Sequence, residues 1–108
     1  MIEIRRYLTA AGKDVVGDWL ARLNDDRAPA RVLVCLNRLS VGNFGSCKPL
    51  RQGVSELRID YGPGYRVYYS SLGRTCIVLL CGGDKRTQSA DIARAIRHLQ
   101  DYKDRSAT

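Results

Sequence analysis

Three strand-like segments follow one another closely in the second half of the chain, and this succession constrains the fold more than any other feature. VSELRIDY (54–61) and YRVYYS (65–70) alternate side chains of different character, whereas TCIVLLC (75–81) is almost continuously apolar. The turns between them, GPG and SLGR, are too short to hold a crossover helix. We therefore expect adjacent antiparallel strands, with the apolar segment central or covered on both faces.

Helical patterns surround this group of strands. IEIRRYL (2–8) reads as one more short strand, and apolar stripes then predict helices over 14–23 and 30–42. A loop rich in glycine, serine, asparagine and proline separates this helical hairpin from the later strands. The final helix is predicted over 89–102, with its buried stripe at Ile92, Ala95, Ile96 and Leu99.

The order of these elements defines the expected fold class. It is α+β with the order β-α-α-β-β-β-α, in which helices pack on a twisted, mainly antiparallel sheet built largely from the last three strands. A chain of 108 residues is long enough for one hydrophobic core. We predict a single domain over 1–104 and a frayed tail over 105–108.

The charge balance favours an anionic partner. Eighteen Lys and Arg against eleven Asp and Glu give a formal charge of +7, and most of the positive residues are arginine. The arginine fork matches phosphate, so nucleic acid is one candidate; a solubilising surface or an acidic protein partner are the others. We find neither an apolar run of membrane-spanning length nor a signal-peptide core, which predicts a cytoplasmic protein without membrane association.

The residues that usually hold metals or nucleotides show no recognisable spacing. The four cysteines form no CxxC pair, and the one histidine, His98, lies in a helical pattern far from them in sequence. The glycine-rich stretches complete neither GxGxxG nor GxxxxGK[ST]. We expect free thiols, no metal and no cofactor.

Strand parity predicts a basic surface on the sheet. If the apolar residues of 54–61 face the helices, Glu56 and Arg58 face outward on the other side. Arg66 and Tyr68 of the next strand then share that outward face. This parity predicts an exposed surface that carries both basic and aromatic side chains.

Such a surface suits metal-free RNA cleavage. Attack of a ribose 2′-OH on the adjacent phosphate develops negative charge that fixed cations stabilise, and a lysine or tyrosine with a depressed pKa can transfer the proton. The candidate residues on or beside this surface are Arg58, Tyr61, Arg66, Tyr68, Lys85, Arg86 and Gln88.

Two blocks of sequence resemble a known family. GVSELRIDYGPGYRVYY and VLLCGGDKRTQSADIARA are similar to the signature of the RelE/ParE toxin superfamily, and more narrowly to its HigB-like, phage Gp49-like addiction module killer proteins. The resemblance implies a RelE-like fold and the toxin of a type II toxin–antitoxin system. For a toxin of the RelE or HigB type it implies a metal-independent, ribosome-dependent endoribonuclease that cleaves mRNA and inhibits translation. It also implies a toxin–antitoxin hetero-oligomer with a cognate antitoxin, HigA-like and containing a helix-turn-helix domain.

The resemblance also assigns roles to residues. It implies catalytic roles for Arg58, Arg66 and Lys85, and we assign substrate binding to Arg86, Gln88, Tyr61 and Tyr68. RelE has a catalytic tyrosine near the start of its last helix, where this chain has about Ile92. The general base therefore stays open between Lys85 and Tyr68. Asp91 either holds Lys85 or Arg86 in place or helps the helix to begin.

Two alternatives share the fold. The chain could be a ParE-like toxin that acts on DNA gyrase without nuclease activity, or an inactive homologue that serves only to bind the antitoxin. The cluster of Arg58, Arg66 and Lys85 favours the nuclease, because a gyrase binder has no need of three cations in one pocket.

Overall fold

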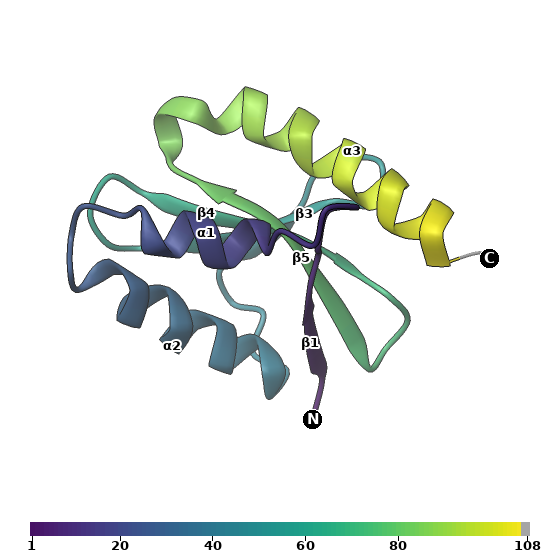
Figure 1. The fold of residues 1–108 in the computed structure, drawn as a ribbon. Coiled ribbons are helices and arrows are strands. Elements are labelled where there is room, and N and C mark those ends of the chain that lie inside the picture. Colours follow the sequence, from purple (N-terminus) through teal and green to yellow (C-terminus); the bar gives the residue numbers. More distant parts are fainter. Residues whose placement is uncertain (107–108) are drawn as a thin grey trace.

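A five-stranded sheet forms the centre of the protein (Figure 1). The computed structural model describes residues 1–106. In chain order the strands are β1 (Glu3–Arg6), β2 (Cys47–Pro49), β3 (Ser55–Ile59), β4 (Tyr65–Ser71) and β5 (Cys76–Gly83). Across the sheet their order is β1-β5-β4-β3-β2, with β1 parallel to β5 and the other neighbours antiparallel. The mainly antiparallel α+β fold is thus confirmed.

Helices cover both faces of the sheet. The helical hairpin of α1 (Val15–Ala21) and α2 (Ala28–Ser40) lies on one face, and α3 (Gln88–Ser106) lies on the other (Figure 1). A short 3-10 turn, η1 (Lys85–Thr87), joins β5 to α3. The sheet is therefore the middle of three layers, which explains why all eight residues of β5 are buried.

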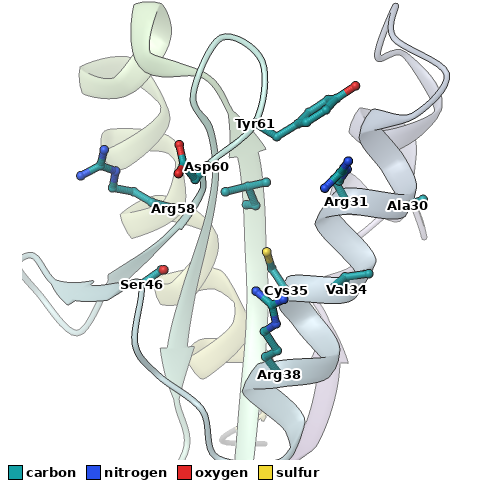
Figure 2. A pocket seen from close by; sticks show the side chains of 10 residues that line it. Ala30, Arg31, Val34, Cys35, Arg38, Ser46, Arg58, Asp60 and Tyr61 are labelled. Carbon is teal, nitrogen blue, oxygen red and sulfur yellow. The ribbon is translucent and has the colours of Figure 1, made fainter.

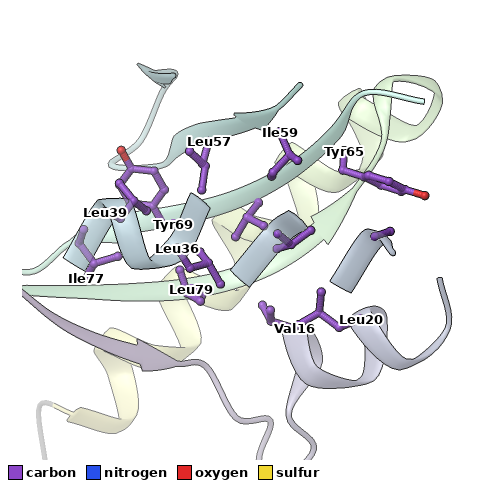
Figure 3. Packing of buried hydrophobic residues seen from close by; sticks show 13 residues of the cluster. Val16, Leu20, Leu36, Leu39, Leu57, Ile59, Tyr65, Tyr69, Ile77 and Leu79 are labelled. Atoms are coloured by element: carbon purple, nitrogen blue, oxygen red, sulfur yellow. The ribbon is translucent and has the colours of Figure 1, made fainter. Parts of the chain in front are cut away.

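The face under the helical hairpin holds the larger of two hydrophobic clusters. Figure 3 shows Leu57 and Ile59 of β3 and Leu79 of β5 pointing toward Val16 and Leu20 of α1 and toward α2. The predicted apolar stripes of the first two helices are thus confirmed as core-facing. Asp14 caps α1, since its carboxylate accepts a hydrogen bond from the Gly17 N–H at 3.0 Å.

The opposite face is where one sequence prediction is wrong. The strand parity itself is correct, but the predicted exposed basic and aromatic surface does not exist as such, because α3 covers much of it. Tyr68 is 0% exposed and packs with Val78 and Leu80 of β5 and with Ala95 and Leu99 of α3. Alternation on β4 therefore separates side chains that face the helical hairpin from side chains that face α3, and both sets are largely buried.

The remaining differences concern short segments. The predicted loop after the hairpin contains β2, three residues that pair with β3 and extend the sheet by one strand. The last helix continues to Ser106, through the first part of the predicted frayed tail; residues 107–108 lie outside the described residues.

All four cysteines are free thiols. Among the described helices, not one has the length and apolarity needed to cross a membrane.

Candidate active site

Three strand ends and one turn bring the predicted cations to the same end of the sheet. Arg58 of β3 lies directly opposite Arg66 of β4, and Arg66 lies opposite Gly83 at the end of β5. The chain then enters η1 with Lys85. Register therefore gathers residues that are far apart in sequence, as predicted for Arg58, Arg66 and Lys85.

Gly64 lies in the turn between β3 and β4 and allows that turn to approach Arg66 and Lys85 closely. Its φ of +80° lies in the left-handed region that favours glycine. A Cβ added at Gly64 would lie 3.3 Å from Nη1 of Arg66 and 3.8 Å from Cβ of Lys85. Arg66 and Lys85 thus flank the same point of the β3–β4 turn.

The guanidinium of Arg66 is held in one orientation. Its Nε donates to Oε1 of Glu56 at 2.8 Å, and its Nη1 donates to the Gly64 carbonyl at 2.7 Å. Both partners of the Arg66–Glu56 ion pair are buried, with side chains 9% and 4% exposed. Nη2 of Arg66 makes no hydrogen bond with the described part of the chain. It is a fixed donor that an incoming anion can accept from.

Glu56 connects this arginine to the start of α3. The same Oε1 atom also accepts a hydrogen bond from Nε2 of Gln88 at 2.9 Å. Gln88 therefore braces the predicted cluster through the Glu56 carboxylate. Strand parity placed Glu56 on the same face, but Glu56 was not among the predicted site residues. The signal was available, because Glu56 is the diagonal cross-strand neighbour of Arg66 and such opposite-charge pairs interact.

Arg58 and Lys85 differ from Arg66 in their freedom. Both are exposed, and neither side chain makes an ion pair or hydrogen bond within residues 1–106. They are exposed positive charges around one fixed guanidinium. This arrangement can bind an anion at Arg66 and surround it with further cations.

A buried brace fixes η1 to the sheet. The Asp91 carboxylate accepts hydrogen bonds from the Thr87 hydroxyl and from Nη2 of Arg94, which also donates to the Gly82 carbonyl at 3.2 Å. Gly83 is required here, because a Cβ at that position would overlap the Asp91 carboxylate. Asp91 therefore stabilises the turn that carries Lys85 and contacts Lys85 only indirectly, through Thr87.

Tyr68 lies beneath this site and does not reach the surface. Its hydroxyl is buried and finds no hydrogen-bond partner among the described residues. Burial raises the pKa of Tyr68, and the nearby carboxylates of Glu56 and Asp91 raise it further. The phenol therefore stays protonated at neutral pH, which is the opposite of what a general base needs.

Two other predicted residues point elsewhere. Arg86 pairs with Asp84 at 3.0 Å and lines a hollow beside Trp19 of α1. The hydroxyl of Tyr61 donates to Oδ2 of Asp25 at 2.7 Å, and Figure 2 shows Tyr61 extending toward α2 while Arg58 points the other way. The structure thus separates both residues from the Arg66 cluster.

His98 has a structural environment. Its Nδ1 lies 2.9 Å from the Leu80 carbonyl, and its ring stacks on Tyr7 with centroids 4.5 Å apart. Burial lowers the pKa of His98, so the imidazole is neutral at pH 7. No group of three or more His, Cys, Asp or Glu in the described chain is arranged to hold a metal ion.

Comparison with known proteins agrees with the narrower part of the sequence resemblance. The model of the family "Phage derived protein Gp49-like (DUF891)" matches residues 18–103. An uncharacterized protein of Haemophilus influenzae is 48% identical over 77 residues, which cover 71% of this chain and 78% of that protein. The matched range contains α2, four of the strands and every candidate site residue. The chain belongs to the Gp49-like family of phage-derived proteins.

Proposed function

We propose that this protein is the toxin of a type II toxin–antitoxin system and that it cleaves mRNA on the ribosome. Membership of the Gp49-like family supports the toxin part of the proposal, because that family is associated with such toxins. The observation that carries the nuclease part is the fixed Arg66 guanidinium, whose Nη2 is not bonded to any described residue, with Arg58 and Lys85 beside it.

The proposed reaction is an internal transesterification. The ribose 2′-oxygen forms a bond to phosphorus and loses its proton to a base, while the bond from phosphorus to the 5′-oxygen breaks. The departing oxygen takes up a proton. The products are a 2′,3′-cyclic phosphate and a 5′-hydroxyl, so no metal-activated water is consumed.

Arg66 serves this reaction through preorganisation. Negative charge grows on the non-bridging oxygens in the transition state, where Nη2 of Arg66 can donate a hydrogen bond. Glu56 already holds the guanidinium in place, so little reorganisation is needed as the charge develops. One such preorganised donor is commonly worth about 3–4 kcal/mol of the activation barrier.

Proton transfer is assigned to Lys85 rather than to Tyr68. Lys85 is exposed at the edge of the site, whereas Tyr68 is buried beneath it with a raised pKa. Arg58 then supplies a second cation on the phosphate. Gln88 and Glu56 act as positioning residues, because they reach the substrate only through Arg66.

The partners follow from the same surface. We propose that mRNA and the ribosome supply the phosphates, and that a cognate antitoxin with an acidic segment neutralises the toxin, consistent with the net charge of +7. Co-purification of the pair followed by salt titration tests this part. A complex that does not form, or that forms without blocking toxicity, would contradict it.

The nuclease test uses exposed residues, so that activity and folding stay separate. Arg58→Ala and Lys85→Ala remove charges without burying or exposing anything, whereas Arg66→Ala would leave Glu56 buried and unpaired at a cost of about 3–5 kcal/mol. Arg74→Ala, in the turn between β4 and β5, is the matched control. The readout is the map of mRNA 5′ ends in translating cells.

We expect codon-phased cleavage from the wild type and from Arg74→Ala. Each of the two site variants should cleave roughly 100-fold more slowly, with a smaller effect on ribosome binding. The absence of phased cleavage by the wild type, together with gyrase-linked DNA damage, would instead support the ParE-like alternative.

A further inference from the structure

A basic cavity lies outside the Arg66 cluster, between α2 and β3 (Figure 2). Its volume is about 330 Å³. Arg31 and Arg38 of α2 form one side, while Arg58 and Tyr61 line the side of β3 and the turn that follows it. Arg58 lines the cavity at the edge of β3, but its side chain points away from α2, as Figure 2 shows.

The cavity is open because β3 loses its outer neighbour. Pairing with β2 ends at Leu57 opposite Cys47, and the last backbone bond runs from the Arg58 N–H to the Ser46 carbonyl at 3.0 Å. Beyond that point no strand of the described chain pairs with the outer edge of β3. The opening connects the two faces of the sheet around this edge.

The arginines of the cavity lack acidic partners. The side chains of Arg31, Arg38 and Arg58 form no ion pair with the described residues, in contrast to Arg86 and Arg66, which each pair with a carboxylate. One carboxylate, that of Asp60, also lines the cavity. The lining therefore carries an excess of positive charge that an anion can neutralise.

A cation–π contact borders the same cavity. The guanidinium of Arg31 lies 5.0 Å from the centroid of the Tyr61 ring, whose hydroxyl is fixed by its bond to Asp25. The floor is apolar, with Val34, Cys35 and Ile59. Stacked planar groups beside phosphate-binding cations are the usual means of holding a single-stranded nucleic acid.

We propose that this groove, formed by Arg31, Arg38 and Tyr61, binds the single-stranded RNA that flanks the cleaved phosphate. The strand leaves the Arg66 site past Arg58, crosses the open edge of β3, and places phosphates against Arg31 and Arg38. One base lies against the cation–π pair of Arg31 and Tyr61. This inference rests on the proposed nuclease function and extends its substrate site from one phosphate to a tract.

The test measures the binding of a fluorescent 12-nucleotide RNA made non-cleavable by 2′-O-methylation. Arg31→Ala/Arg38→Ala is compared with Arg74→Ala/Arg97→Ala, which removes the same charge from exposed positions elsewhere. Each lost contact with single-stranded phosphate lowers the log–log salt slope by about 0.7. For two contacts we expect the slope to fall by about 1.4, and the affinity at 0.1 M salt to fall roughly 25-fold.

The control double variant should lose much less, with an equal melting temperature. An equal loss in both double variants would overturn the groove, since net charge alone would then explain binding. An Arg31→Ala/Arg38→Ala protein that keeps RNA affinity but loses the antitoxin would overturn it too, by assigning the groove to a protein partner.

The experiments distinguish a wrong proposal for the groove from a wrong proposal for the nuclease activity. Loss of RNA affinity in Arg58→Ala/Lys85→Ala, without loss in Arg31→Ala/Arg38→Ala, would refute only the groove. Unchanged affinity in both, with no cleavage by the wild type in a translation reaction, would refute the proposed function and the inference that rests on it.

Discussion

Replacing Tyr68 by Phe should stabilise the protein, although the residue lies in the middle of the core. The Tyr68 hydroxyl is buried without a hydrogen-bond partner in residues 1–106, and a buried unsatisfied polar group costs about 1–3 kcal/mol. Phe keeps the ring and its packing under α3 while removing that group. We expect a gain of about 1 kcal/mol, which for a chain of this size raises Tm by roughly 4 °C.

The matched control is Tyr7→Phe, on the same side of the sheet. The Tyr7 hydroxyl donates to Oδ2 of Asp101 at 2.6 Å, so its removal should lower the free energy of unfolding by about 1 kcal/mol. Thermal and urea unfolding of both variants give the comparison. A lower Tm for Tyr68→Phe would refute the reasoning, and loss of mRNA cleavage at unchanged stability would mean that the hydroxyl takes part in the reaction.

Three further perturbations address the brace, the ion pair and the pH dependence. Glu56→Gln should reduce the free energy of unfolding in urea by about 3 kcal/mol, because Arg66 stays buried without its counter-ion; a change below about 0.5 kcal/mol would contradict the buried pair. Gly83→Ala should lower Tm by several degrees, since its Cβ would overlap the Asp91 carboxylate, and an unchanged Tm would show that the brace yields easily. Below its ordinary pKa of 6.5, His98 is protonated more readily in the unfolded chain than in the fold. Stability should therefore fall as pH drops from 6.5 toward 5, by up to about 1.4 kcal/mol per pH unit, and this slope should disappear in His98→Gln.

Much of the fold was predictable because the apolar periods are long. Alternation over 54–61 and 65–70 correctly divided each strand into two faces, and the apolar run at 75–81 correctly indicated a strand covered on both sides. Periodicity does not say which layer covers which face, so the burial of Tyr68 under α3 was missed, as was the burial of Arg66 in its ion pair with Glu56. The three residues of β2 are too few to show any period.

The site was predictable to the extent that strand register determines it. Arg58 and Arg66 come together because they are cross-strand partners, and Lys85 and Gln88 follow the end of the neighbouring strand. Tyr61 and Arg86 lie beyond strand ends, where a period of two no longer fixes the direction of a side chain. The pairing of Glu56 with Arg66 was also available from the register, but it was missed because an acidic residue in an alternating strand ordinarily reads as solvated.

The chemical nature of the RNA ends shows whether the protein cuts mRNA by transesterification. Wild-type protein is added to a purified translation reaction, and the ends of the cut mRNA are identified by enzymatic labelling. Transesterification by fixed cations predicts 5′-hydroxyl ends together with 2′,3′-cyclic phosphates, and the same ends in much smaller amount from Lys85→Ala. Cleavage that leaves 5′-phosphates, or an intact message under conditions in which translation stops, would contradict the account.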